Sequence, residues 1–178
     1  KASDNYPKRY HTLRSYQFEV YITIMKEITF HPMTQKEFNK YIKFSWANYI
    51  EQQIIAGLSK EEAKLQANRA EMDLIPNGFS TENNYFYNIK KNGKLLGYLW
   101  LWFNSENHNL FLPEVYIKET YRGKGIGELA MKFYEEKAKE LNAKKLKLHV
   151  FGHNTNAQGL YKKLGFTPTN IVMEKVVK

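Results

Sequence analysis

The chain of 178 residues contains no cysteine. This absence excludes disulfides, thiolate metal sites and any mechanism that passes an acyl group through a cysteine nucleophile. Long apolar runs are also missing: the longest, from Leu95 to Phe103, is about half of the roughly 20 residues that a membrane-spanning helix needs. The composition, 43% apolar and 25% charged, is ordinary for a globular protein. We therefore expect one soluble domain that crosses no membrane, with a cytoplasmic location.

Acidic residues are few relative to basic ones, with 18 Asp and Glu against 27 Lys and Arg and a net charge of +9. Such an excess is compatible with an anionic partner, such as nucleic acid or an acidic cofactor. Lysines and glutamates alternate between residues 132 and 140, however, which is typical of a solvated helix face with intrahelical ion pairs. We expect no nucleic-acid partner, and a basic nucleic-acid-binding module is the minor alternative.

The first 24 residues show neither helix caps nor a clear apolar period. Met25, in contrast, starts a segment that continues at once into a predicted strand. We interpret residues 1–24 as a tag or an N-terminal extension and residues 25–178 as the domain itself.

Two capping boxes predict the first two helices. The box from Thr34 to Glu37 precedes a helical apolar period that lasts until Gly57, and the box from Ser59 to Glu62 opens a second helix. Asn92-Gly93 is the strongest short hairpin signal and joins two predicted strands. The later predicted elements are strands at 85–89, 95–103 and 111–117, a helix at 126–141, a strand at 145–150, a helix from Thr155 and a final strand within 167–177.

This order of elements predicts a mixed sheet. Three consecutive strands on short loops pair antiparallel, whereas a strand, a long helix and a further strand require a parallel crossover. The expected fold class is α/β, with a single mixed, mostly antiparallel twisted sheet flanked by helices. The turn after strand 111–117 then lies at the carboxyl end of a central strand, where open α/β sheets bind ligands.

That turn reads Arg122-Gly123-Lys124-Gly125-Ile126-Gly127. Its glycines expose backbone N–H groups at the positive end of a helix, which favours a phosphate. A P-loop is excluded because Lys124 precedes Gly125 and no Ser or Thr follows. The dinucleotide pattern G-x-G-x-x-A is present from Gly125 to Ala130, but the strand at 145–150 lacks the acidic residue that it requires. A third pattern, R-x-x-G-x-G/A, matches the whole turn.

A second motif accompanies this turn. The segment from Asn154 to Phe166 matches N-x-x-A-x-x-L-Y-x-x-x-G-F. With both motifs in order around a strand, the chain resembles the GCN5-related N-acetyltransferase (GNAT) family from about Phe111 to Phe166. The resemblance implies the GNAT fold and an acetyl-CoA-dependent N-acetyltransferase that acetylates a primary amine by direct attack. A noncatalytic acyl-CoA sensor on the same fold is the alternative.

The resemblance also implies where the coenzyme binds. In this family the fourth strand carries a bulge and splays from the fifth, which leaves backbone groups free for the pantetheine arm. Pro113 supports a bulge here, because a proline within a central strand is tolerated mainly at a bulge or an edge. Val115 N–H is the candidate donor to the thioester oxygen. The expected coenzyme-binding residues are Val115, Ile117, Arg122, Gly123, Lys124, Gly125, Ile126, Gly127 and Asn154, of which Asn154 is equally suited to capping the helix that follows.

Two residues are the candidates for catalysis. Tyr161 occupies the family's tyrosine position, and a phenol with a pKa of about 10 stays protonated at pH 7 and can protonate a leaving thiolate. The alternative is a packed helix face. Glu114 is the candidate general base, directly or through water, because a carboxylate inside an apolar strand is costly unless it is exposed or used. Its alternative is an exposed strand face.

The acceptor is not identified by these residues. In the family it is framed by the first two helices and the last strands, and we expect a small-molecule amine, with a homodimer as a possible assembly. Trp46 and Tyr49 fit the core stripe of the first helix as well as an acceptor cleft, and the candidate carboxylates are Glu51, Glu71 and Asp73. His149 and His153 have no cysteine or carboxylate at ligand spacing, so we expect no metal.

Overall fold

The computed structural model describes residues 27–175 and residue 177, so the segment 1–24 lies outside the described residues. Two short 3-10 turns also occur, at Gly78–Ser80 and Glu119–Tyr121. The strands and α-helices, in chain order, are β1 (Ile28–Pro32), α2 (Gln35–Ile55), α3 (Lys60–Leu74), β2 (Asn84–Lys91), β3 (Lys94–Asn104), β4 (Asn109–Ile117), α4 (Ile126–Glu140), β5 (Lys145–Leu148) and α5 (Thr155–Lys163).

The strands form one sheet in the order β1-β2-β3-β4-β5. The first four strands pair antiparallel, and β4 pairs parallel with β5. The β2–β3 hairpin turns at Asn92 and Gly93, whose φ angles of 48° and 75° have the sign that a two-residue hairpin requires. The predicted mixed, mostly antiparallel sheet is therefore confirmed.

Helices α2 and α3 begin at the predicted capping boxes. The Thr34 backbone N–H donates to Glu37 Oε2 at 2.9 Å, and the Glu37 backbone N–H donates back to Thr34 Oγ1 at 3.3 Å. Ser59 and Glu62 make the same reciprocal pair at 2.9 and 3.3 Å. Each box satisfies N–H groups that a helix end otherwise leaves without partners, which explains why these boundaries could be predicted.

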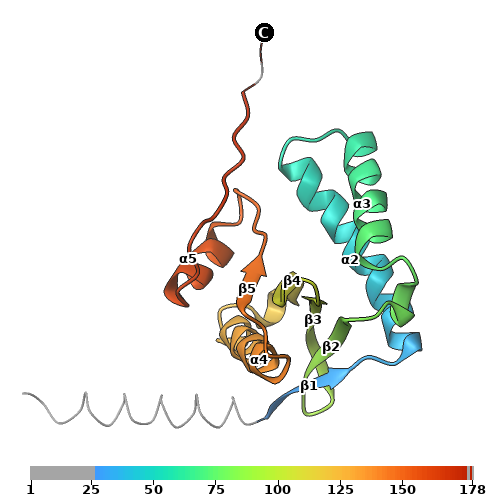
Figure 1. The fold of residues 1–178 in the computed structure, drawn as a ribbon, viewed down its shortest axis with the longest axis vertical. Coiled ribbons are helices and arrows are strands. Elements are labelled where there is room, and N and C mark those ends of the chain that lie inside the picture. Colours follow the sequence, from blue (N-terminus) through green and yellow to red (C-terminus); the bar gives the residue numbers. More distant parts are fainter. Residues whose placement is uncertain (1–26, 176, 178) are drawn as a thin grey trace, which may run out of the picture.

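Each face of the sheet carries its own core. The α2–α3 pair lies on one side of the sheet and α4 with α5 on the other (Figure 1). Alternation along the strands divides the apolar side chains between the two sides. Phe86 and Trp100 pack with Phe38 of α2, whereas Ile89 and Leu99 pack with Met131 of α4.

The predicted final strand within 167–177 is wrong for the residues that the structure describes. No described residue of this segment is in a strand, and Ile171, Val172 and Met173 are 72%, 91% and 89% exposed. The segment extends away from α5 (Figure 1). Its β-branched residues favour an extended backbone, but a strand forms only where a neighbouring strand pairs with it.

Strand β5 also ends at Leu148 rather than at Val150. No helix within the described part of the chain is both long and apolar enough to cross a bilayer.

Candidate active site

Strands β4 and β5 separate halfway along β4. They pair only where Asn109–Leu112 faces Lys145–Leu148. The β3–β4 register shifts between Trp100 and Trp102, so β4 carries an extra residue beside Pro113, as the sequence predicted. Beyond this bulge, the side of β4 that faces β5 has no partner strand among the described residues.

The backbone N–H groups of Val115 and Ile117 face this opening. Lys118 N donates to Leu96 O of β3 at 2.9 Å, so the N–H group of Lys118 points toward β3. Successive N–H groups of a strand point to opposite sides. Those of Val115 and Ile117, which are three and one residues before Lys118, therefore point away from β3. The structure thus leaves backbone donors available where the two strands have parted.

Tyr134 of α4 holds the strands together just before they separate. Its hydroxyl lies 2.6 Å from Leu110 O of β4 and 2.8 Å from Lys147 O of β5, and it accepts from Lys147 N at 3.0 Å. Burial raises the pKa of Tyr134 far above its usual range, so the hydroxyl keeps its proton. Sequence reasoning missed this residue, since it lies in the apolar stripe of α4 and resembles any other core tyrosine.

The glycine turn adopts the backbone that the motif requires. Gly123 and Gly125 have φ angles of 72° and 77°, and Gly125 caps α4 without any side-chain hydrogen bond. The first N–H groups of α4, at Ile126 and Gly127, therefore have no acceptor within the helix. A Cβ atom at Gly123 would meet nothing within 4 Å, so the backbone is open there. This arrangement suits an anionic group.

Gly127 has a second role that the motif did not indicate. A Cβ atom at this position would lie 3.3 Å from Leu160 Cδ2 of α5. The missing side chain lets α4 and α5 pack closely, in addition to exposing the backbone.

Both cationic side chains of the turn contact residues that precede the turn. Arg122 Nε donates to Ile117 O at 2.9 Å, and the guanidinium lies 5.6 Å from the centre of the Tyr116 ring. Lys124 Nζ donates to Thr120 O at 3.0 Å. These contacts brace the loop between β4 and α4, and contact of either side chain with a phosphate stays a prediction.

Tyr161 is 8% exposed and packs against Phe166 with a ring separation of 6.0 Å. Its hydroxyl has no hydrogen-bond partner among the described residues. Burial raises the pKa of Tyr161, so the phenol remains protonated at neutral pH. The side chain thus belongs to the core and still carries an unused donor.

Asn154 caps α5, which was one of its two expected roles. Its Oδ1 accepts from Ala157 N at 3.2 Å. Contact of Asn154 with the coenzyme stays a prediction.

Glu114 accepts three hydrogen bonds from one face of α2. Tyr41 Oη and Ser45 Oγ donate at 2.7 and 2.8 Å to Oε2, and Asn48 Nδ2 donates at 3.3 Å to Oε1. Burial raises the pKa of Glu114, and the three donors offset part of this effect by stabilising the ionised form. The exposed-face alternative for Glu114 is therefore wrong.

Sequence reasoning missed the three donors, although they share a signal. They lie four and three residues apart along α2, which places them on one helix face. Polar residues at that spacing beside apolar ones indicate a buried polar contact, but the partner carboxylate is 66 to 73 residues away in sequence.

Glu114 and Tyr161 lie on opposite sides of the sheet. The Glu114 carboxylate faces α2, whereas Tyr161 packs in the core that contains α4. The part of β4 that does not pair with β5 lies between these two sides.

The residues considered for the acceptor are only partly brought together. Trp46 packs edge-on against Trp100 at 5.9 Å, which supports its core interpretation, and Tyr49 contacts Phe151 at 6.1 Å. His153 Nε2 lies 2.8 Å from Gln52 Oε1, so the loop after β5 reaches α2. The candidate carboxylates Glu51, Glu71 and Asp73 are exposed on α2 and α3.

Metal ligands are not gathered in the part of the chain that the structure describes. No group of three or more His, Cys, Asp or Glu side chains there is arranged to hold an ion.

Comparison with known proteins gives a consistent result. Residues 44–166 match the model of the Acetyltransferase (GNAT) family. The chain is 38% identical over 151 residues to the uncharacterized N-acetyltransferase YdgE of Bacillus subtilis, covering 83% of this chain and 96% of that protein. It is 34% identical over 148 residues to the uncharacterized N-acetyltransferase YycN of the same organism, covering 81% and 95%.

Solved structures show the same fold. The crystal structure of YycN from Bacillus subtilis superimposes with a TM-score of 0.78 at 33% identity, covering 85% of this chain and 99% of that one. An aminoglycoside N-acetyltransferase in complex with CoA has a TM-score of 0.54 at 11% identity, covering 85% and 95%. At that identity the second likeness supports the fold alone.

Proposed function

The chain belongs to the acetyltransferase (GNAT) family and is an N-acetyltransferase, and from this premise we propose that it transfers an acetyl group from acetyl-CoA to the primary amine of a small molecule by direct attack. The observation that carries the proposal is the opening between β4 and β5, with the Glu114 carboxylate on one side of the sheet and the unpartnered Tyr161 hydroxyl on the other.

The glycine turn is the proposed site for the pyrophosphate of the coenzyme. The N–H groups of Gly123 to Gly127 and the positive end of α4 fit a doubly charged group, and no side chain fills the space beside Gly123. Acetyl-CoA supplies an activated acetyl thioester. The free backbone groups of Val115 and Ile117 suit the amide-bearing arm, and Val115 N–H is the proposed donor to the thioester oxygen.

Glu114 is the proposed general base. Attack requires a neutral amine, so a proton must leave the ammonium form of the acceptor. The raised pKa of Glu114 makes its carboxylate a better proton acceptor than an exposed one, and its charge favours a cationic acceptor on the α2 side. A bridging water is an equivalent route for the same proton.

Tyr161 is the proposed general acid. Its phenol holds a proton at neutral pH and has no competing hydrogen-bond partner among the described residues. The proton would pass from Tyr161 Oη to the leaving sulfur as the carbon–sulfur bond breaks.

Thermal shift and thiol release test this function together. A ligand at about 100 times its Kd stabilises the fold by about 2.7 kcal/mol, so CoA and acetyl-CoA should raise Tm and NAD should not. Thiol release from acetyl-CoA is then followed across a panel of polyamines, amino acids and aminoglycosides. Because the chain has no cysteine, the thiol reagent reports only free CoA. Stabilisation by NAD but by neither coenzyme would overturn the proposal.

A further inference from the structure

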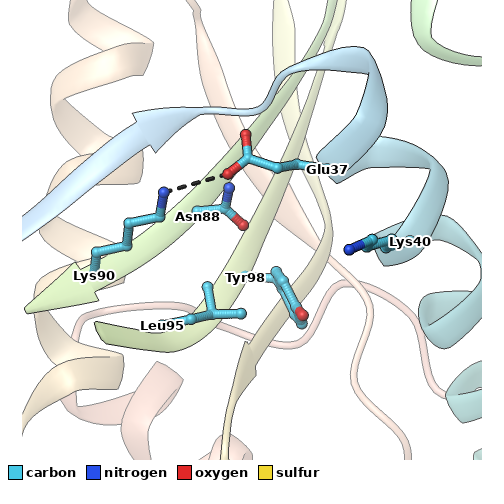
Figure 2. A pocket seen from close by; sticks show the side chains of 6 residues that line it. All are labelled: Glu37, Lys40, Asn88, Lys90, Leu95 and Tyr98. Atoms are coloured by element: carbon cyan, nitrogen blue, oxygen red, sulfur yellow. Dashed lines mark hydrogen bonds and ion pairs between the residues drawn. The ribbon is translucent and has the colours of Figure 1, made fainter. Parts of the chain in front are cut away.

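A small pocket lies between the first turns of α2 and the β2–β3 hairpin, apart from the glycine turn and the Glu114 cluster. It has a volume of about 170 Å³. Figure 2 shows its lining, which comes from three elements: Glu37 and Lys40 of α2, Asn88 and Lys90 of β2, and Leu95 and Tyr98 of β3.

Asn88 is the unusual member of this lining. The residue is 3% exposed, and its side chain has no hydrogen-bond partner among the described residues. Trp46 Nε1 is the one side-chain N or O atom of the described residues that is sealed from solvent without a partner, so solvent still reaches the Asn88 amide. This amide lies at the pocket between the Glu37–Lys90 pair and Tyr98 (Figure 2). A ligand in the pocket would accept a hydrogen bond from it in place of water.

The charges around the pocket favour an anion with a single charge. Glu37 is neutralised by Lys90 Nζ at 3.3 Å and by the N–H of Thr34. Lys40, which points toward the same space (Figure 2), has no ion-pair or hydrogen-bond partner among the described residues. The pocket therefore offers one unpaired ammonium, one unpaired amide and a wall formed by Leu95 and Tyr98.

We propose that this pocket binds the carboxylate group of a small ligand, with Lys40 Nζ and Asn88 Nδ2 as its donors. A doubly charged phosphate fits less well, because Glu37 lies in the lining and only one cation is unpaired. The site is distinct from the reacting centre. One link between them is the contact of the Tyr98 and Tyr41 rings, 5.0 Å apart, and Tyr41 in turn donates to Glu114.

The test is an NMR titration of the full chain, labelled with nitrogen-15, at neutral pH and constant ionic strength. The probe is propionate, which carries one negative charge, and its matched uncharged probe is propionamide. We expect propionate at millimolar concentration to shift the side-chain amide signal of Asn88, and propionamide to leave it in place. An Asn88 signal that does not move, or that moves equally with both probes, would overturn the proposal.

Variants identify the donors. Lys40→Gln should weaken propionate binding roughly fivefold, the upper end for one exposed charge pair. Lys43→Gln is the matched control, because it removes the same charge from an exposed position of the same helix and should change the affinity less than twofold. Equal losses in both variants would contradict a specific site.

Asn88→Asp places a second carboxylate in the pocket and should abolish propionate binding. If this buried substitution prevents folding, the Lys40 and Lys43 pair still decides the question. All of these readouts measure binding without turnover, so their failure is separate from failure of the proposed acetyl transfer.

Discussion

At the scale of single residues, burial raises the pKa of both candidate catalytic groups. The raised pKa of Tyr161 keeps its phenol neutral, whereas the raised pKa of Glu114 makes its carboxylate a stronger base. The Glu114 side chain also has three donors, whereas the Tyr161 hydroxyl has none among the described residues. An acid and a base can therefore coexist at neutral pH.

Tyr161→Phe removes one hydroxyl and leaves the packed ring in place. We expect kcat to fall by roughly 10²-fold to 10⁴-fold with little change in CoA affinity, because only the proton donor is lost. Thiol release and a CoA titration measure the two quantities. Tyr85→Phe, which removes a phenol from β2, is the control and should keep its activity. A kcat of the Tyr161 variant within twofold of that of the unsubstituted protein would contradict the role of Tyr161 as general acid.

Tyr41→Phe should change the pH dependence of catalysis. Tyr41 donates to the ionised Glu114 and lowers its pKa, so the loss of this donor raises the pKa. Activity appears as Glu114 loses its proton, and the rising limb of kcat/KM should therefore move to higher pH. Ser45→Ala should move it the same way. If the rising limb of kcat/KM stays at the same pH in both variants, that result argues against Glu114 as the general base.

At the scale of elements, the loop from β4 to α4 combines three local devices. The bulge beside Pro113 ends pairing with β5, two left-handed glycines redirect the chain, and Arg122 fixes the loop through its bond to Ile117 O. Tyr134 then holds β4 and β5 together below the opening. The separation of β4 from β5 therefore follows from these defined contacts and is not fraying at a strand end.

Gly125→Ala tests the glycine turn, with Gly93→Ala as a matched control. Both glycines have nearly equal positive φ angles, 77° and 75°, so each alanine should destabilise the fold by about 1–2 kcal/mol. Only Gly125→Ala should also weaken CoA binding, because relaxation of this turn displaces the first N–H groups of α4. Urea denaturation and CoA titration separate the effects. Equal losses of CoA affinity would show that the turn has no special role.

At the scale of the whole molecule, acid should weaken the fold. Hydrogen bonds from Thr34, Ser59 and Lys163 lower the pKa of Glu37, Glu62 and Glu128, respectively, below their ordinary value of 4.5. A group with a lowered folded pKa contributes stability that is present above the unfolded pKa and is lost as pH falls through the folded one. Glu114 has a raised pKa and opposes this trend, since its protonated form is favoured by folding.

The urea midpoint should therefore fall between pH 6 and pH 3, and the growing positive charge adds to the loss. Glu62→Gln should show a smaller fall, because it removes one of the three contributing carboxylates. Glu61→Gln, in the same helical turn, makes no hydrogen bond or ion pair with another described side chain and is the control. A Glu62→Gln profile identical to that of Glu61→Gln would contradict this account.

Several features of the fold and the site could be predicted because their causes are local. Each capping box needs two residues three positions apart, and the Asn92-Gly93 hairpin and the glycine turn need only a few consecutive residues. The lack of a final strand among the described residues of 167–177 could not be predicted, because β-branched residues favour an extended chain without supplying a partner for it. The pocket beside Asn88 had no sequence signal, since its lining comes from three elements.

By itself the sequence determined the order of the elements as far as α5, the mixed sheet, the bulge beside Pro113 and the backbone of the glycine turn. Only the tertiary structure decided that Glu114 is held by Tyr41, Ser45 and Asn48, and that Tyr134 bridges β4 and β5. The physical reason is distance along the chain. Local steric and capping preferences act within a few residues, whereas desolvation and hydrogen bonding of a buried carboxylate depend on groups that meet only after the helix has packed on the sheet.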